Sequence, residues 1–153
     1  MFRGTDAVSV DEKGRFAVPA RYRAHLRDHC HNQLVVTLHH QAPCLLLYPQ
    51  PQWLEFEQRL LAKGGLNADV RRLQRHFVGN ARELELDKQG RVLLPQLLKQ
   101  FAGLNSRAVL VGLGQSFELW NEGDWKTEFE AGRSQIARDG GLKLPAGLED
   151  LPL

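Results

Sequence analysis

Two short segments of the sequence place acidic, glycine and arginine residues at a spacing suited to binding phosphate or nucleic-acid bases. Asp11-Glu12-Lys13-Gly14-Arg15 and Asp87-Lys88-Gln89-Gly90-Arg91 share the pattern Asp-x-x-Gly-Arg. An aspartate that opens a turn accepts hydrogen bonds from nearby backbone N–H groups and can hold an arginine at a fixed angle. A fixed guanidinium suits phosphates and guanine edges. The alternative is a plain turn with an exposed ion pair, which contributes about 0–1 kcal/mol.

The two segments belong to a longer internal repeat. Val8–Pro19 aligns with Leu84–Pro95 at a constant offset of 76 residues, as from Arg15 to Arg91. The apolar positions match as well: Val8, Val10, Phe16 and Val18 correspond to Leu84, Leu86, Val92 and Leu94. We infer a duplication, since the match extends well beyond the turn.

Each half of the chain predicts the same order of elements. Alternating apolar residues around the turn indicate two strands, and Gly14 and Gly90 supply the positive φ of a tight connection. Pro19 and Pro95 favour helix starts, followed by a strand, a turn, a strand and a helix. The apolar side of the two short helices is predicted to consist of Tyr22, Leu26, Leu97, Leu98 and Phe101.

The intervening region predicts two further helices, near 51–62 and 68–78, with Asn67 as a possible N-cap. The chain is therefore expected to be mainly β with short helices, an α+β protein. Because one hairpin pair of this size is marginally stable, we expect the two halves to interleave into a closed barrel. The predicted divisions are 1–66 for the first repeat, 67–130 for the second (helix about 67–79, hairpin about 81–95) and 131–153 for a C-terminal tail.

Charge is unevenly distributed along the 153 residues, although the net charge is only +2. Residues 71–91 hold six Lys or Arg against three Asp or Glu, whereas 115–130 hold five acids against Lys126 alone. One basic surface for phosphates and one acidic surface are compatible with this pattern, and so are two ordinary solvated faces. The chain has no apolar run long enough to cross a membrane and no signal peptide, which predicts an intracellular protein.

Neither metal binding nor catalysis is indicated. His25, His29, Cys30 and His31 form the most metal-like cluster, but their spacing matches no structural zinc pattern. Cys30 and Cys44 are expected to be free thiols. Because the sequence has no phosphate-binding loop, nucleophile elbow or HExxH motif, we predict no enzymatic activity, no cofactor, no metal and no small-molecule substrate.

Several motifs together resemble the MraZ family of the AbrB/SpoVT-like group. They are Met1-Phe2-Arg3-Gly4, Asp11-x-Lys13-Gly14-Arg15, Val18-Pro19-x-Arg21-Tyr22-Arg23, Pro43-Cys44-Leu45-Leu46-Leu47-Tyr48-Pro49, Arg71-Arg72 and Phe117-Glu118-Leu119-Trp120. The resemblance covers residues 1 to about 130. It implies a double-psi, swapped-hairpin β-barrel built from two tandem AbrB-like repeats, and subunits that assemble into a ring.

The resemblance also implies sequence-specific DNA binding through the two turns. Arg15 and Arg91 take the role of the family's tip arginines, and Lys13 and Lys88 suit phosphates as point charges. Arg3, Arg21 and Arg23 are predicted to broaden the positive strip. The turn residues Asp11, Gly14, Asp87 and Gly90 are assigned a structural role. Because Gln89 replaces the lysine before the glycine, and because Arg21 and Arg23 follow the first turn, we predict that Arg15 is the main DNA contact.

The implied function is regulation of transcription at the division and cell-wall gene cluster. The partners would be double-stranded DNA with repeated promoter boxes and further copies of the chain, in a ring of eight or more subunits. Such a protein would be cytoplasmic and nucleoid-associated, with no membrane partner. The alternative is a ring-shaped scaffold that binds other proteins and touches nucleic acid only non-specifically.

Overall fold

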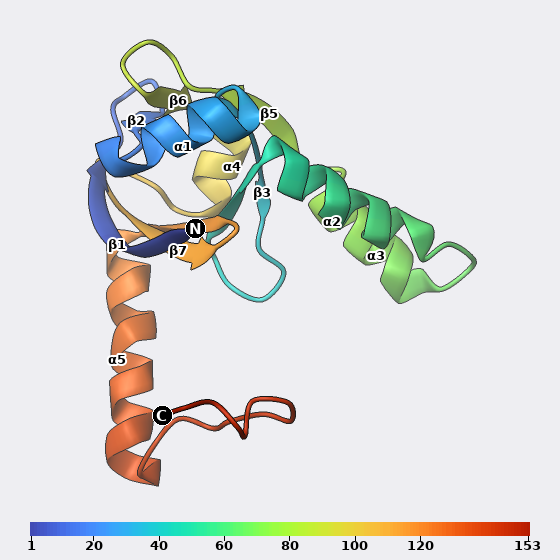
Figure 1. Ribbon diagram of the computed structural model, residues 1–153, viewed down its shortest axis with the longest axis vertical. Coiled ribbons are helices and arrows are strands. Elements are labelled where there is room, and N and C mark those ends of the chain that lie inside the picture. Colours follow the sequence, from blue (N-terminus) through green and yellow to red (C-terminus); the bar gives the residue numbers. More distant parts are fainter. The chain divides into compact units, whose positions relative to one another are not determined.

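The computed structural model describes residues 1–153, which form two compact units, Met1–Glu122 and Gly123–Leu153. It is a mixed α+β structure with five helices (Figure 1). The elements are β1 (Phe2–Ser9), β2 (Arg15–Ala17), α1 (Ala20–Cys30), β3 (Gln33–Leu38), β4 (Leu45–Pro49), α2 (Gln50–Ala62), α3 (Ala68–Phe77), β5 (Arg82–Glu85), β6 (Arg91–Leu93), α4 (Gln96–Phe101), β7 (Arg107–Gly114), β8 (Phe117–Asn121) and α5 (Glu122–Asp139).

The order predicted for each half is confirmed. The first half runs β1, β2, α1, β3, β4, α2, and the second runs β5, β6, α4, β7, β8, α5, with α3 between them. Gly14 and Gly90 have φ values of 91° and 75°, as the predicted turns require. Pro19 and Pro95 stand directly before the first residues of α1 and α4.

The strands pair mainly across the two halves of the chain. A six-stranded sheet has the order β1-β7-β8-β4-β3-β5, and β2 and β6 form a separate two-stranded ribbon. The prediction of a hairpin closed along Val8–Pro19 is therefore wrong beyond one bridge, between Val10 and Phe16. Away from the turns, β1 pairs with β7 and β5 pairs with β3, while β2 pairs with β6. Pairing between the two halves is favoured over pairing within one hairpin because each strand then buries its apolar face in a core that both halves share.

The buried apolar residues form two clusters. The larger one contains residues from both halves, including Phe16, Val18, Leu26, Leu47, Val92, Leu94, Leu110 and Phe117. Phe16 and Val92, the central residues of β2 and β6, are each only 1% exposed. Full burial of such a side chain contributes about 1.5–3 kcal/mol, so the inner face of the ribbon is firmly attached.

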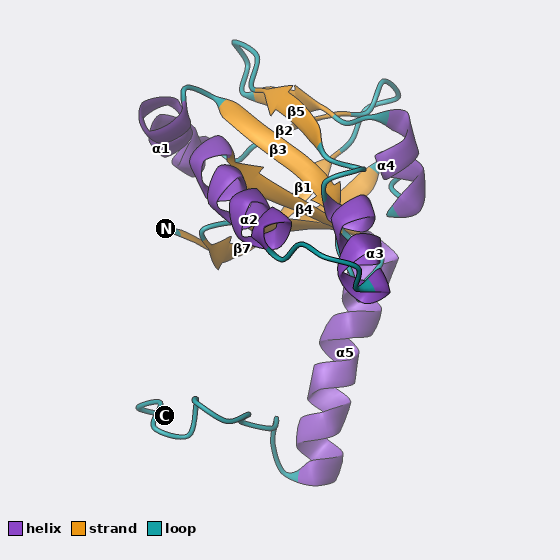
Figure 2. Ribbon diagram, turned by 90° about the vertical axis from the view of Figure 1, so that its right-hand side faces the viewer, coloured by secondary structure: helices purple, strands orange, loops and turns teal.

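The two proline-initiated helices, α1 and α4 (Figure 2), bury different numbers of their residues. In α1, Tyr22 and Leu26 are buried as predicted. In α4, only Leu98 is buried, whereas Leu97 and Phe101 are 66% and 42% exposed, so the predicted apolar side of this helix is only partly buried. A helix of six residues makes fewer than two turns, and only one of its apolar positions reaches the core.

Helices α2 and α3 form a pair that extends from the sheet (Figure 1). The predicted N-cap is confirmed, because the Asn67 side chain accepts hydrogen bonds from the backbone N–H groups of Asp69 and Val70. Gln74 of α3 donates to the carbonyl of Leu60 at 3.3 Å and to that of Lys63 at 3.2 Å. These bonds tie the two helices together at the connecting loop.

In the second unit, α5 extends to Asp139 and so enters the predicted tail, while 140–153 hold no regular secondary structure. Phe129 and Ile136 of α5 are 58% and 49% exposed. None of the helices combines the length and the apolar character that a membrane span requires.

Candidate nucleic-acid interface

The first tip, residues 11–15, is organised around one carboxylate. Asp11 Oδ1 accepts hydrogen bonds from the backbone N–H groups of Lys13 at 3.0 Å and Arg15 at 2.8 Å. Its Oδ2 accepts one from Arg15 Nε at 2.7 Å. The backbone closes the turn, since Gly14 N–H donates to the Asp11 carbonyl at 2.9 Å. The guanidinium is thus held through Nε, which leaves the hydrogen-bond donors of its two terminal nitrogens for another group.

The second tip, residues 87–91, repeats this geometry. Asp87 Oδ1 accepts from the backbone N–H groups of Gln89 and Arg91, both at 2.9 Å, and Oδ2 accepts from Arg91 Nε at 3.0 Å. Arg15 and Arg91 have exposed side-chain fractions of 33% and 35%. The two tips therefore present their arginines to solvent to the same extent.

Both tip aspartates stay ionised over the physiological pH range. The backbone hydrogen bond from Arg15 is the largest cause that lowers the pKa of Asp11, and the Arg15 side chain adds to it. The pKa of Asp87 is lowered in the same way by Arg91. The anchoring carboxylates thus keep the charge that orients the arginines.

The ribbon brings the two arginines onto one surface. In its antiparallel register, Arg15 lies opposite Leu93, and Ala17 lies opposite Arg91. Residues directly opposite in such a pair point to the same face, and so do residues two apart on one strand. Arg15 and Arg91 consequently share the outer face, as diagonal neighbours with backbones about 7–8 Å apart. Figure 1 shows both turns at the same end of the first unit.

Each tip is also locked to the other repeat by the backbone. The Val18 N–H donates to the Gly90 carbonyl and the Leu94 N–H donates to the Gly14 carbonyl, each at 2.9 Å. The relative position of the two arginines is therefore set by hydrogen bonds and not by a flexible loop.

The other predicted basic residues fall into different environments. Lys13 and Lys88 are exposed on the first and second tips. Arg3 is an exposed residue of β1. Arg21 is held by β1, because its terminal nitrogens donate to the two carboxylate oxygens of Asp6 at 2.7 and 2.5 Å. This contact raises the pKa of Arg21, so Arg21 remains fully charged but is engaged within the chain.

Arg23 does not support the first tip, contrary to what the sequence suggested. It lies against Gly90 of the second tip, while Lys99 of α4 lies against Gly14 of the first. Sequence reasoning missed Lys99. The repeat offset of 76 contained the signal, because it relates Lys99 to Arg23.

The histidine and cysteine residues near the end of α1 are not gathered around one point. The Cys30 thiol is buried and donates to the Leu26 carbonyl at 3.1 Å. His25 and His29 stack with ring centroids 5.1 Å apart, and His29 Nε2 lies 3.0 Å from Gln52 Oε1. The thiol and these imidazoles face different surroundings, which disfavours a shared ion.

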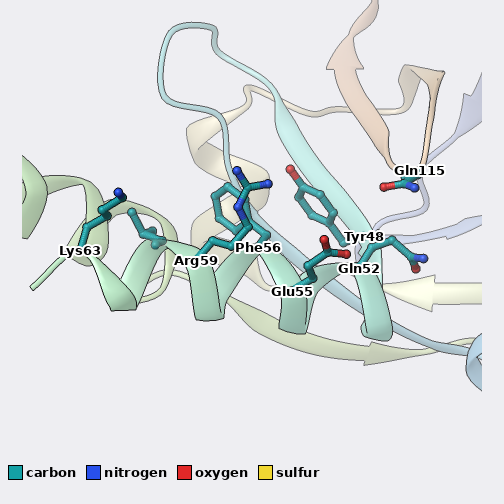
Figure 3. A pocket seen from close by; sticks show the side chains of 8 residues that line it. Tyr48, Gln52, Glu55, Phe56, Arg59, Lys63 and Gln115 are labelled. Atoms are coloured by element: carbon teal, nitrogen blue, oxygen red, sulfur yellow. The ribbon is translucent and has the colours of Figure 1, made fainter.

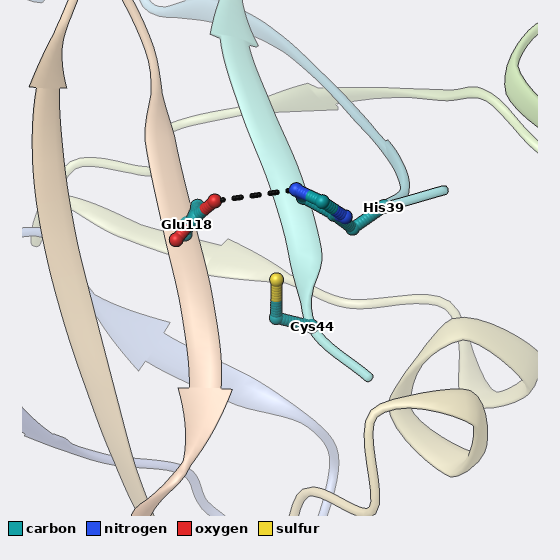
Figure 4. A group of neighbouring side chains, drawn as sticks. All are labelled: His39, Cys44 and Glu118. Carbon is teal, nitrogen blue, oxygen red and sulfur yellow. Dashed lines mark ion pairs between the residues drawn. The ribbon is translucent and has the colours of Figure 1, made fainter. Parts of the chain in front are cut away.

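A second group, which the sequence did not suggest, brings His39, Cys44 and Glu118 together (Figure 4). Their potential ligand atoms lie within 4.8 Å of one another. His39 Nδ1 accepts from the backbone N–H groups of Gln41 and Ala42 at 2.9 and 3.1 Å, so the ring proton lies on Nε2, 3.5 Å from Glu118 Oε2. Binding a metal through Nε2 would move that proton to Nδ1, against two donors. The group fits a contact between the β3–β4 loop and β8 better than a metal site.

A groove lies beside α2 and has a volume of about 480 Å³ (Figure 3). Tyr48 and Phe56 stack in it with ring centroids 5.6 Å apart, and Leu60 extends their apolar surface. The other residues that line it are polar or charged: Gln52, Glu55, Arg59, Lys63 and Gln115. The groove therefore combines an aromatic pair with charges of both signs.

Comparison with known proteins shows the class of the protein. The family model described as MraZ protein matches the chain twice, at residues 1–76 and 77–138. The transcriptional regulator MraZ of Pseudomonas aeruginosa is 46% identical over 153 residues, covering both chains completely. That of Thioalkalivibrio sulfidiphilus is 51% identical over 125 residues, covering 82% of this chain and 83% of its own. That of Methylococcus capsulatus is 46% identical over 151 residues, covering 99% and 94%.

The two repeats thus define a tandem-repeat transcriptional regulator, a class without enzymatic activity. The chain belongs to the MraZ family. Both the family resemblance and the duplication read from the sequence are confirmed, while the predicted repeat boundaries at 66, 67 and 130 remain predictions.

Proposed function

We propose that this protein binds double-stranded DNA in a sequence-specific manner through its two tips. The observation that carries the proposal is the shared outer face of the ribbon, on which two aspartate-held arginines lie as diagonal neighbours. A guanidinium held by Nε can donate from both terminal nitrogens to guanine O6 and N7 in the major groove. Because neither arginine needs to be ordered on binding, little conformational entropy is lost.

The exposed lysines of the tips supply phosphate contacts in this proposal. Lys13 and Lys88 can neutralise backbone charge as point charges, and Arg3 can extend the strip from β1. Arg21 contributes to the local positive potential, but its hydrogen-bonding groups are turned to Asp6. Phosphate contacts then set the register on DNA, and the arginines read the bases.

We further propose that the two sheets close into a swapped-hairpin barrel, because the tips link β1 to β2 and β5 to β6 at both ends of the large sheet. In this scheme, subunits assemble into a ring of eight or more copies, and each copy engages one of several repeated promoter boxes. Linked weak contacts then give strong binding through effective concentration. The regulated genes would be the division and cell-wall cluster, with the protein in the cytoplasm at the nucleoid.

A gel-shift titration tests the proposal. The full chain is titrated against duplex DNA from upstream of its own gene and against scrambled DNA of the same composition, at several salt concentrations. Preferential binding of the upstream DNA is expected. Equal affinity for both duplexes at every salt concentration would contradict sequence-specific recognition.

A protein-binding scaffold is the second candidate, and the groove beside α2 favours it. Tyr48, Phe56 and Leu60 offer an apolar surface that suits a side chain of a partner. The scaffold function predicts salt-sensitive DNA binding without sequence preference, so the same titration separates the two candidates.

A further inference from the structure

Arg23 reaches the second tip although it follows the first tip in the chain. A Cβ atom added to Gly90 would lie 2.3 Å from Arg23 Nε and 2.6 Å from Cζ, so the guanidinium covers the open face of this glycine. Arg23 Nε donates to the Val18 carbonyl at 2.8 Å. Because the Val18 N–H in turn donates to the Gly90 carbonyl at 2.9 Å, the Arg23 head group is fixed beside the second tip.

Lys99 has the corresponding place at the first tip. A Cβ atom added to Gly14 would lie 3.8 Å from Lys99 Cδ, so the Lys99 side chain passes beside this glycine. Lys99 follows Arg23 by the repeat offset of 76 residues and is half-buried on α4. The two repeats thus exchange cations: α1 of the first lies at the tip of the second, and α4 of the second lies at the tip of the first.

We propose that each DNA-reading tip is composite, with a turn from one repeat and a flanking cation from the other. The second tip consists of Arg91 with Arg23, and the first tip consists of Arg15 with Lys99. This inference rests on the proposed DNA binding and adds Lys99 to the contact residues, as well as a pairing that runs against chain order.

The chemistry of the two flanking cations differs. Arg23 is held through Nε, so its two terminal nitrogens remain to grip one phosphate with two hydrogen bonds. Lys99 passes its apolar stem beside Gly14 and carries an ammonium, which acts as a point charge. The second composite tip is thus the more rigid one, and it gains a bidentate phosphate contact that the first tip lacks.

Double-mutant cycles on DNA affinity test the pairing. The cycles combine Arg23→Ala or Lys99→Ala with Arg91→Ala or Arg15→Ala, and fluorescence anisotropy measures binding to the upstream duplex. Each single flanking variant should weaken binding about tenfold and lower the slope of log affinity against log salt by about 1. Arg23 should be coupled to Arg91, and Lys99 to Arg15, while the pairs Arg23 with Arg15 and Lys99 with Arg91 should be additive.

The matched controls are Arg27→Ala on α1, an exposed arginine paired with Asp28, and Gln100→Ala on α4. Both should bind DNA like the unmodified protein. If Arg23→Ala lowers the melting temperature, Arg23→Lys serves as a second variant that keeps the positive charge. Arg23→Lys should recover the salt slope but not the full DNA affinity. Coupling of Arg23 to Arg15, or unchanged binding by both flanking variants, would overturn the composite tips. If the unmodified protein showed no preference for the upstream duplex over scrambled DNA, sequence-specific binding itself would be refuted.

Discussion

The two tips have the same backbone and the same anchoring bonds but carry different charges. Arg15 Nε and Arg91 Nε lie 2.7 and 3.0 Å from their aspartates, and both belong to one ribbon. The first tip holds Asp11, Glu12, Lys13 and Arg15, which sum to zero, whereas Asp87, Lys88 and Arg91 of the second sum to +1. Duplication thus kept the geometry that aims an arginine and let the surrounding charge change.

The structure changes the basis for ranking Arg15 above Arg91. The sequence supports that ranking through Lys13 and through Arg21 and Arg23 behind the first tip. In the structure, Arg21 is turned to Asp6, and Arg23 lies against the second tip. The equal anchoring of Arg15 and Arg91 therefore predicts that both arginines read bases, while the flanking cations make the phosphate contacts of the two tips unequal.

The largest effect is expected from removing a tip arginine. Arg15→Ala and Arg91→Ala should each weaken binding to the upstream duplex by about 1–3 kcal/mol and reduce its advantage over scrambled DNA. Anisotropy titrations measure both quantities, and size-exclusion chromatography checks that assembly is unchanged. Similar losses would support two equivalent readers. A much smaller loss for Arg91→Ala would support the ranking drawn from the sequence.

Next in size is the effect of a methyl group on the tip glycines. Gly14→Ala and Gly90→Ala both place an L-residue at positive φ, which costs about 1–2 kcal/mol. Gly90→Ala should cost more, because its Cβ would collide with Arg23 at 2.3 Å, whereas the nearest atom to that of Gly14 is the Leu94 carbonyl oxygen at 3.2 Å. Urea unfolding measures the difference. Equal losses in the two variants would show that Arg23 moves aside freely.

Acidification should release both tips together. The pKa of each tip aspartate is depressed in the folded protein, so its stabilising effect is present above the unfolded value of about 3.9 and is lost as pH falls toward the lowered pKa. Between pH 5 and 8, both carboxylates stay ionised, so neither Asp11 nor Asp87 should make the free energy of unfolding depend on pH. Urea titrations of the protein with Asp11→Asn and Asp87→Asn at pH 3 to 8 test this. If the unmodified protein already lost stability at pH 6 and one of the two variants did not, this expectation would be contradicted.

The smallest effect is expected from the tip lysines. Lys13→Ala and Lys88→Ala should each lower the slope of log affinity against log salt by about 1, with no change in preference between the upstream and scrambled duplexes. The exposed Lys126 on α5 provides the control variant Lys126→Ala. An unchanged slope for one of the two would mark the tip that lies away from the phosphate backbone.

Much of the fold could be predicted because local sequence carries its signals. Alternation of Val8, Val10, Phe16 and Val18, the glycine in each turn and the proline before each helix gave the order of elements correctly. The strand partners could not be predicted this way. A period-two pattern indicates that one face of a strand is buried, but it does not indicate which other strand pairs with it through backbone hydrogen bonds. The pattern of apolar residues also could not show that the short helix α4 buries only Leu98 and leaves Leu97 and Phe101 exposed.

The sequence by itself determined the duplication, the two turns and the anchoring of each arginine by the aspartate four residues before it, because these depend on contacts between near neighbours in the chain. Only the tertiary structure decided that both arginines share one face, and that Arg23 and Lys99 exchange tips. These relations join residues about 70 or more positions apart. They arise from the pairing of β2 with β6, which buries Phe16 and Val92 in a common core and thereby sets two distant turns side by side.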